Sequence, residues 1–401
     1  MSGRDRFVYC KNGSVADELA TLEADPGRGT KGGPYHYIAT FLKWSTGAQV
    51  LLLSYDEQPK AYRSGSVQAH VLLRRQRRWR LTATLQKIRI FASTFARVMA
   101  FRPTWVFCAA SGPALWACFL AARIYGAPIV HTRHNRLERA AGGVAAWETR
   151  VNAAVIRHVS AAIAHGPFLA QELAATGIPA ARLREFNLNY RHLLAPPKAN
   201  KATPDLTREG TRTVLLFMGR LVEDKGIFDL LTALAARLRE DSSLCLAYAG
   251  DGPARERLAA DVQALGLGDQ VALLGHLEER MLHAVVQQAR AVILPTRRRL
   301  PEGRCKAANE ALVLGTPVIA PALRPFTDLI VHERNGLLYE PESVPALAQA
   351  LYRVLDDEAL DETLRTEGTE YSHRLLLDPP LTFEAALEWA YQGSQGELAS
   401  A

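Results

Sequence analysis

The chain alternates between two hydrophobic patterns, and this alternation predicts its fold class. Short continuous apolar runs are typical of strands buried on both faces of a parallel sheet, whereas apolar residues at every third or fourth position predict amphipathic helices. The strand-like runs are residues 7–10, 49–54, 67–73, 105–109, 127–132, 159–165 and 184–187, then 214–218, 244–249, 271–274, 291–294 and 318–320. Helical patterns separate most of them, so we expect an α/β protein whose parallel sheets carry helices on both faces.

One segment interrupts these patterns and predicts a domain boundary. Residues 196–212 are rich in Pro, Lys and Thr and have no apolar periodicity, as is typical of a linker. We therefore expect a first domain over residues 1–195 and a second over 213–375, with a C-terminal helix within 376–401. A chain of 401 residues is long enough to give two domains with a core each.

A long uncharged stretch, residues 105–122, has the length of a membrane span. Ser111-Gly112-Pro113 divides it, however, so we expect a buried strand followed by a helix that begins near Pro113. The start of the chain lacks an apolar signal region, and the five cysteines include no CxxC pair. We expect a cytoplasmic protein without a disulfide framework or a zinc site.

Positive charge is concentrated in the first half. Residues 58–137 contain two Lys and twelve Arg but no Asp or Glu, although the net charge of the whole chain is only +7. Part of this charge lies on an amphipathic helix expected over Arg80–Ala100. The helix either packs on the core with a solvated basic face or docks on anionic lipid at the inner face of the membrane. No nucleic-acid-binding motif accompanies the charge.

The strongest chemical signal lies in residues 300–320. Pro301 and Gly303 indicate a loop, helix formers follow over residues 304–314, and Glu310 lies about 12 Å along the helix from Glu302. The first N–H groups of a helix have no internal partner and carry partial positive charge, which predicts a phosphate site. The residues at that helix start are Gly303, Arg304, Cys305 and Lys306.

A second phosphate-binding loop is expected after the strand 214–218. Gly219 and Arg220 follow the strand directly, and Lys225 precedes the next helix. Cations on a strand-to-helix loop can neutralise a diphosphate and stabilise it as a leaving group. Gly250 ends the next strand in the same way, and the carboxyl ends of parallel strands share one edge of a sheet.

Glu302 and Glu310, with seven residues between them and Gly315-Thr-Pro-Val after them, resemble the signature of glycosyltransferase family 4. The resemblance implies the GT-B fold, in which two Rossmann-like doubly wound domains face a central cleft. It also implies a retaining transferase that moves a sugar from a nucleotide diphosphate sugar to a hydroxyl acceptor. Glu302 would then meet the donor sugar, Glu310 the ribose hydroxyls, and Arg220 and Lys225 the diphosphate.

Further roles follow from the same resemblance. Gly32 and Gly33 match a glycine pair near the donor phosphate or acceptor. His134 best matches a histidine after a strand of the first domain, and His131 is the competing candidate. Leu274 and His276 correspond to residues that line the base pocket. In this fold the C-terminal helix crosses back to the first domain.

The chain contains no Asp-x-Asp motif, so we expect no metal and no cofactor other than the nucleotide sugar. The expected partners are a glycan or glycolipid acceptor, such as a precursor of a surface polysaccharide, and an anionic membrane surface, but no nucleic acid. The run Arg297-Arg298-Arg299 either recognises further negative charge or is solvated. Alternatives to transfer are a sugar phosphorylase or sugar-nucleotide epimerase of the same fold, and a catalytically silent donor-binding subunit.

Overall fold

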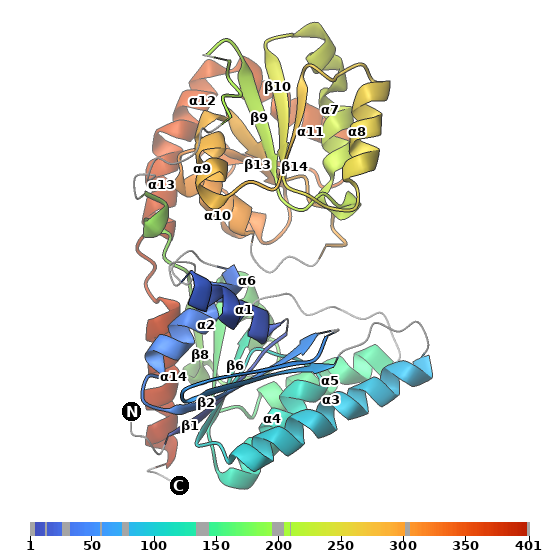
Figure 1. The fold of residues 1–401 in the computed structure, drawn as a ribbon. Helices are drawn as coiled ribbons and strands as arrows, with labels where there is room; N and C mark the ends of the chain where they lie inside the picture. The colour runs from blue at the N-terminus through green and yellow to red at the C-terminus, as the bar shows by residue number, and fades with distance from the viewer. Residues whose placement is uncertain are drawn as a thin grey trace. The chain divides into compact units, whose positions relative to one another are not determined.

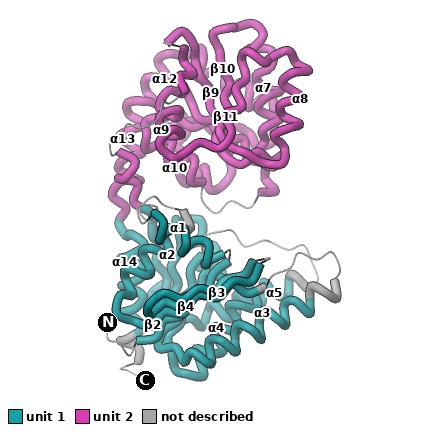
Figure 2. The backbone as a smooth tube through the Cα atoms, viewed as in Figure 1, with its two compact units in different colours: residues 1–188, 380–401 teal, residues 189–379 magenta. Residues whose placement is uncertain are grey.

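The structure is a computed structural model that describes residues 5–12, 14–25, 33–56, 58–73, 80–133, 144–194, 204–208, 210–300 and 305–398. The chain forms two compact units (Figure 2). Unit 1 comprises residues 1–188 and 380–401, and unit 2 comprises residues 189–379. Residues 189–194 belong to unit 2, where the Asn309 side chain donates a hydrogen bond to the Tyr190 hydroxyl at 2.9 Å.

Unit 1 is built on an eight-stranded sheet with the strand order β3-β4-β2-β1-β5-β6-β7-β8 (Figure 1). Neighbouring strands are parallel except for β3, which pairs with β4 in antiparallel orientation. The strands are β1 (Arg6–Cys10), β2 (Gln49–Asp56), β3 (Lys60–Ser64), β4 (Val67–Leu73), β5 (Trp105–Cys108), β6 (Ile129–Arg133), β7 (Ala161–His165) and β8 (Leu183–Phe186).

Helices cover both faces of this sheet, and the central strands are therefore buried on both sides. They are α1 (Val15–Ala24), α2 (Gly33–Trp44), α3 (Arg80–Phe101), α4 (Pro113–Tyr125), α5 (Val144–Ile156), α6 (Pro167–Ala174) and α14 (Phe383–Leu398). On one face, aromatic rings join the central strands to α2 and α14, and Trp44 stacks on Phe7 with 5.5 Å between ring centroids. The Trp105 indole donates a hydrogen bond to Ser394 at 3.2 Å, so the last helix is part of the core of unit 1.

Unit 2 contains a six-stranded parallel sheet with the order β11-β10-β9-β12-β13-β14. Its strands are β9 (Thr213–Met218), β10 (Leu244–Ala249), β11 (Val271–Gly275), β12 (Ala291–Ile293), β13 (Val318–Pro321) and β14 (Gly336–Tyr339). Its helices are α7 (Ile227–Glu240), α8 (Arg255–Ala264), α9 (Glu279–Gln288), α10 (Lys306–Val313), α11 (Val344–Asp356), α12 (Glu358–Arg365) and α13 (Glu367–Leu376). A buried cluster joins β9 and β10 to α7, α8 and α11, whereas α10 contacts both α9 and α13.

Each expected strand has a counterpart in the structure, which confirms the two parallel-sheet α/β domains. The uncharged stretch 105–122 is divided into β5 and α4, as its Ser-Gly-Pro sequence predicted. Strand β3 was not expected, because it lies at the sheet edge with mostly exposed residues and has no apolar run. Among the described helices, none combines the length and apolarity needed to cross a bilayer.

Candidate active site in unit 2

The helix expected near residue 304 is α10, which begins at Lys306. Cys305 precedes it in extended conformation, and no described side chain caps the helix. The first N–H groups of a helix have no partner within the helix and carry partial positive charge, and those of Ala307 and Ala308 face the Cys305 sulfur. The three expected site residues before Cys305 lie outside the described residues; they are Glu302, Gly303 and Arg304.

The loop after β9 is held against its neighbours by backbone contacts. Gly226 has a left-handed backbone (φ 69°), and a Cβ placed there would lie 1.9 Å from the Pro295 carbonyl oxygen. At Gly250 a Cβ would lie 1.8 Å from the Gly219 carbonyl oxygen. These close approaches require glycine, and they fix the loops after β9, β10 and β12 side by side.

Lys225 lies close to the start of α10. Burial lowers the pKa of Lys225, the adjacent Cys305 thiol opposes this shift, and the positive charge of Arg220 adds to it. Burial also raises the pKa of Cys305, and Lys225 opposes that shift. Lys225 thus interacts electrostatically both with Arg220 and with Cys305, the residue that precedes α10. Two cations and a helix N-terminus at one place favour an anionic ligand such as a phosphate.

Glu310 projects from the second turn of α10 and is 6% exposed. Burial raises the pKa of its carboxyl, whereas Lys306, whose ammonium lies 3.0 Å from Glu310 Oε1, lowers it. Glu310 thus lies within two turns of the N-terminus of α10. A buried carboxylate there can accept hydrogen bonds from neutral hydroxyl groups.

Two residues of α9 that the sequence analysis missed lie beside Glu310. The side chains of Glu279 and His283, one helical turn apart, bring their ligand atoms and that of Glu310 within 4.8 Å of one another. Their i, i+4 spacing in the sequence indicates that the two side chains share one face of a helix. Only the packing of α9 against α10 brings that face to Glu310. The group has metal-ligand chemistry, although the Lys306 ammonium already neutralises Glu310.

Three thiols in the core of unit 1 form a second group with metal-ligand chemistry. Cys10, Cys108 and Cys118 are completely buried, and their sulfur atoms lie within 4.8 Å of one another. They come from β1, β5 and α4. Their scattered positions in the sequence therefore did not predict that the three thiols lie together. Apolar side chains surround them, which is the usual environment of free cysteine in a core.

The residues expected at the base pocket lie at the same edge of the sheet. Gly250 donates its N–H to the Gly275 carbonyl at 2.8 Å, which ties the ends of β10 and β11 together. Leu274 is half-buried in β11, and His276 is exposed just beyond it. The expected loops of unit 2 therefore end at one edge of its sheet, as parallel strand order requires.

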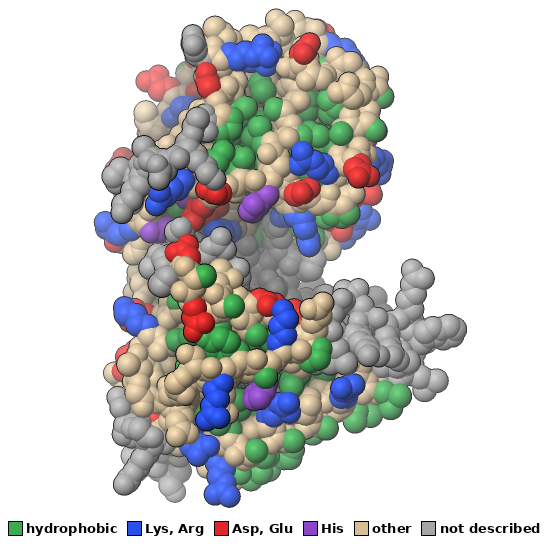
Figure 3. All heavy atoms as spheres, viewed as in Figure 1, with side chains coloured by type: hydrophobic (Ala, Val, Ile, Leu, Met, Phe, Trp, Pro, Cys, Tyr) green, Lys and Arg blue, Asp and Glu red, His purple; other side chains and the backbone are tan. Residues whose placement is uncertain are grey.

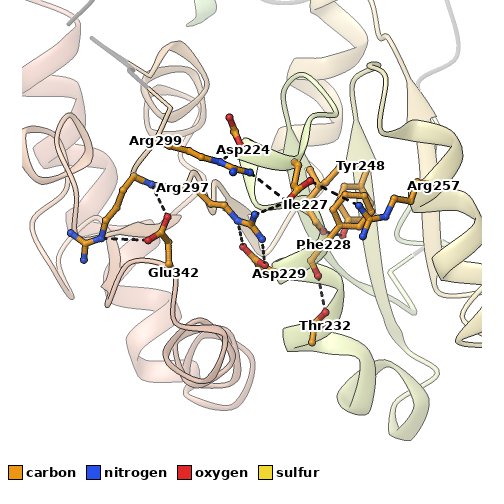
Figure 4. A network of polar contacts seen from close by, with 12 residues as sticks. Asp224, Ile227, Phe228, Asp229, Thr232, Tyr248, Arg257, Arg297, Arg299 and Glu342 are labelled. Atoms are coloured by element: carbon orange, nitrogen blue, oxygen red, sulfur yellow. Dashed lines mark hydrogen bonds and ion pairs between the residues drawn. The ribbon is translucent and has the colours of Figure 1, made fainter. Parts of the chain in front are cut away.

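The arginine run is paired with carboxylates of unit 2. Arg297 and Arg299 form ion pairs with the acids of residues 223–229 (Figure 4), and Arg298 pairs with Glu340. Arg298 and Arg299 are nevertheless 54% and 57% exposed, as expected for a solvated run, whereas Arg297 is only 23% exposed. Sequence reasoning did not find the partners, because these residues lie more than 40 positions away along the chain.

The candidates in unit 1 are less fully described. Gly33 is the first residue of α2, whereas Gly32 and His134 lie outside the described residues. His131 is fully buried in β6, with its Nδ1 3.0 Å from the Cys108 carbonyl oxygen. This contact assigns His131 a structural place in the core.

Comparison with known proteins identifies relatives of both units. The family model described as "Glycosyl transferases group 1" matches residues 199–371, and "Glycosyltransferase Family 4" matches residues 44–185. An alpha-D-kanosaminyltransferase of Streptomyces kanamyceticus is 26% identical over 276 residues, which are 64% of this chain and 69% of the relative. A 2-deoxystreptamine N-acetyl-D-glucosaminyltransferase of Niallia circulans is 26% identical over 156 residues, which are only 39% of either chain.

Solved structures share the fold along the whole chain. A sucrose-phosphate synthase from Thermosynechococcus elongatus superposes with a TM-score of 0.67 at 20% identity, covering 99% of this chain and 100% of that one. HepE of Anabaena in complex with UDP gives the same TM-score at 17% identity, again over 99% and 100% of the two chains. With both units matched by family models, the chain is a glycosyltransferase of the family 4 type with the GT-B fold.

Proposed function

We propose that this glycosyltransferase transfers a sugar from a nucleotide diphosphate sugar to a hydroxyl group of a glycan or lipid-linked acceptor, with retention at the anomeric carbon. The observation that carries the proposal is the positive site in unit 2. Arg220 and Cys305, the residue before α10, both influence the charge of Lys225, and two cations near a helix start suit an anionic diphosphate.

The main catalytic effect in this proposal is electrostatic. When the bond between sugar and diphosphate breaks, negative charge develops on the leaving phosphate. Arg220, Lys225 and the dipole of α10 are preorganised to stabilise that charge. The acceptor hydroxyl attacks from the side of the leaving group and gives its proton to the diphosphate, so no protein nucleophile is needed.

Other residues of the proposal orient the donor. Glu310 receives the ribose hydroxyls, and the positions of Glu279 and His283 support a polar ribose site there. Leu274 and His276 flank the base. Glu302 orients the donor sugar and His134 holds a sugar hydroxyl, roles that follow from the family resemblance.

Two proteins that share this fold act on or bind substrates of the proposed class. HepE of Anabaena was crystallised with UDP-glucose, and WaaB, which superposes with a TM-score of 0.60, is a lipopolysaccharide outer core galactosyltransferase. A panel of nucleotide sugars would identify the base and the sugar of the donor that this chain uses.

The alternatives to transfer differ in what they turn over. A phosphorylase or epimerase would turn over without a hydroxyl acceptor, and a catalytically silent subunit would bind the donor without transferring the sugar.

The proposed membrane partner rests on a surface of unit 1. Most of the exposed large apolar side chains among the described residues lie on three helices of this unit; they are Leu85 and Ile88 on α3, Leu120, Ile124 and Tyr125 on α4, and Trp147 on α5. Exposed Arg89, Arg123 and Arg150 accompany them, and hydrophobic and basic side chains meet over α3 in Figure 3. Apolar side chains rimmed by arginines suit an anionic lipid surface.

The phosphate site gives a first prediction. A thermal-shift panel of UDP-, GDP-, ADP- and TDP-sugars first identifies the donor, because a ligand that binds the folded state raises the midpoint temperature of unfolding. With that donor, we expect Arg220→Ala and Lys225→Ala each to lower kcat by about 10²-fold, since each removes charge stabilisation of the leaving group. Arg239→Ala, an exposed change at the other end of α7, is the control. Sugar transfer at the wild-type rate by both site variants would contradict the mechanism.

Glu310 gives a pH-dependent prediction. Because burial raises its pKa above the ordinary value of 4.5, the folded state holds this proton more tightly than the unfolded chain does. The contribution of Glu310 to the free energy of unfolding is therefore fully present below pH 4.5, and it is lost as the pH rises through the raised pKa. We expect Glu310→Gln to unfold at a higher temperature than the wild type at pH 7, by a margin that shrinks near pH 4.5.

The same variant should bind the nucleotide about tenfold more weakly, because an amide is a poorer acceptor for two ribose hydroxyls. Glu367→Gln, an exposed change on α13, should alter neither property. A Glu310→Gln protein that is less stable at pH 7 and still binds normally would overturn both assignments.

Metal independence is the third prediction. The chain lacks an Asp-x-Asp motif, and Glu310, the carboxylate of α10, is already paired with Lys306. We expect EDTA to leave the rate of sugar transfer unchanged within about twofold in purified protein. Loss of turnover that added Mg²⁺ or Mn²⁺ restores would show that a cation is required.

The surface on unit 1 gives the fourth prediction. Wild-type protein should float with phosphatidylcholine vesicles that contain about one-third phosphatidylglycerol at low salt, and not with pure phosphatidylcholine vesicles. Replacing Leu85 and Ile88 together by Ser should reduce flotation severalfold. Val331→Ser, an exposed apolar residue of unit 2, serves as the control. Wild-type protein that stays in the soluble fraction with anionic vesicles would refute the membrane partner.

A further inference from the structure

Arg133 of unit 1 is a buried cation whose guanidinium is incompletely hydrogen-bonded. It is the last residue of β6, and only 6% of its surface is exposed. Among the described residues, its buried Nε and Nη1 atoms have no hydrogen-bond partner. Burying a charged group without hydrogen bonds is unfavourable for folding, so packing alone does not account for an arginine at this position.

The residues beside Arg133 on the neighbouring strands are small and apolar. Its register partner on β7 is Ala164. On the other side, Cys108 of β5 pairs with His131, and Ala110 follows two positions later, as Arg133 follows His131. Alanine has no polar group with which to compensate a guanidinium. The strands therefore place a cation at this point without supplying its partner.

One carboxylate of α6 influences Arg133 from a distance. Burial lowers the pKa of Arg133 to about 10, and the negative charge of Glu172 opposes this shift. No ion pair joins Arg133 to Glu172 among the contacts of the described residues. With a pKa of about 10, the guanidinium remains positively charged at neutral pH. Arg133 is thus a cation that is attracted to one carboxylate and bonded to none.

The position of Arg133 in the sheet favours an anionic ligand. Arg133 lies at the carboxyl edge of the parallel strands, where ligands bind in open α/β sheets. Helices α4 and α6 follow the neighbouring strands β5 and β7, so both begin at this edge. Ile129 of β6 packs in the same buried cluster as α4 and α6, and the alternation of the strand puts Arg133 on that face. Helix N-termini carry partial positive charge, which adds to that of the guanidinium.

We propose that Arg133 binds an oxyanion of the sugar acceptor, a phosphate or a carboxylate, so that unit 1 selects acceptors that carry negative charge. The inference rests on the proposed function and specifies the acceptor class that this function leaves open. A guanidinium suits both anions, because its planar fork of N–H groups matches two oxygens of either one. The bound anion supplies the hydrogen-bond acceptors that the Nε and Nη1 atoms lack among the described residues.

A binding role and a structural role of Arg133 predict opposite effects on stability. If the guanidinium serves a ligand, its burial destabilises the unliganded protein. Arg133→Met, which replaces the charge by an unbranched apolar side chain, should then raise the midpoint temperature of unfolding by about 2–4 °C. If Arg133 instead stabilises the fold through Glu172, both Arg133→Met and Glu172→Gln should lower that midpoint.

The binding test compares three sugars that differ in charge. Glucose, glucose 1-phosphate and glucuronate are titrated by calorimetry into the full chain. The nucleoside diphosphate selected by the thermal-shift panel is present at saturation, so that it occupies the proposed phosphate site of unit 2. We expect wild-type protein to bind at least one of the two anionic sugars about tenfold more tightly than glucose.

Four variants assign this preference to Arg133. Arg133→Met should bind all three sugars within about twofold of one another and still bind the nucleoside diphosphate as the wild type does. Arg133→Lys, which keeps the charge but loses the planar fork, should retain part of the preference. Glu172→Gln should retain all of it, because the change removes only a competing carboxylate. Arg102→Gln is the matched control, since it removes an exposed positive charge just before β5, at the opposite edge of the same sheet.

The outcomes distinguish the inference from the proposed function. If wild-type protein binds no nucleoside diphosphate of the panel, the proposed function fails, and the acceptor role of Arg133 fails with it. If it binds one but shows no preference for an anionic sugar, or if Arg133→Met keeps the preference, only the inference is overturned. Inorganic phosphate that binds as tightly as glucose 1-phosphate would also refute it, because the anion would then not be recognised as part of an acceptor. A lowered unfolding midpoint in both Arg133→Met and Glu172→Gln would assign Arg133 to the fold instead.

Discussion

The candidate site depends on backbone contacts that exclude any side chain. Gly226 lies so close to the Pro295 carbonyl that a Cβ would be 1.9 Å from its oxygen, and Gly250 approaches Gly219 in the same way. Neighbouring parallel strands alone would leave their loops free to splay apart. These contacts instead fix the loop of Arg220 and Lys225 beside the segment that leads into α10, so charges from separate parts of the sequence act on one ligand.

The charges of the site are arranged in two groups. Lys225 interacts electrostatically with Arg220 and with Cys305 at the start of α10, while the acids of the same loop pair with Arg297 and Arg299 from beyond β12. Such separation matters because a phosphate ligand competes with every carboxylate near its cations. Burial lowers the pKa of Lys225 and raises that of Glu310, so the two groups are held in environments that disfavour their charged forms.

Much of the fold and part of the site were predictable from the sequence, because parallel strands buried on both faces leave continuous apolar runs. Arg220 and Lys225 could be named as candidates because Arg220 follows such a run closely and Lys225 lies on the loop between that run and the next helix. Strand β3 was missed because an exposed edge strand has no apolar signal. The pairing of Arg297 with Asp229, 68 positions apart, and the approach of Glu279 to Glu310 depend on how helices and loops pack, which no local pattern encodes.

The position of α14 has a consequence for synthesis of the protein on the ribosome. Trp105 donates to Ser394 of this last helix, 289 positions away, and Phe7 packs against Tyr391, which lies still further along the chain from it. During synthesis, the aromatic residues of unit 1 that pack against α14 therefore remain uncovered by it until the whole of unit 2 has been translated. Unit 2 is a continuous segment and can complete its own sheet first. Unit 1, most of which is synthesised first, therefore completes its folding last.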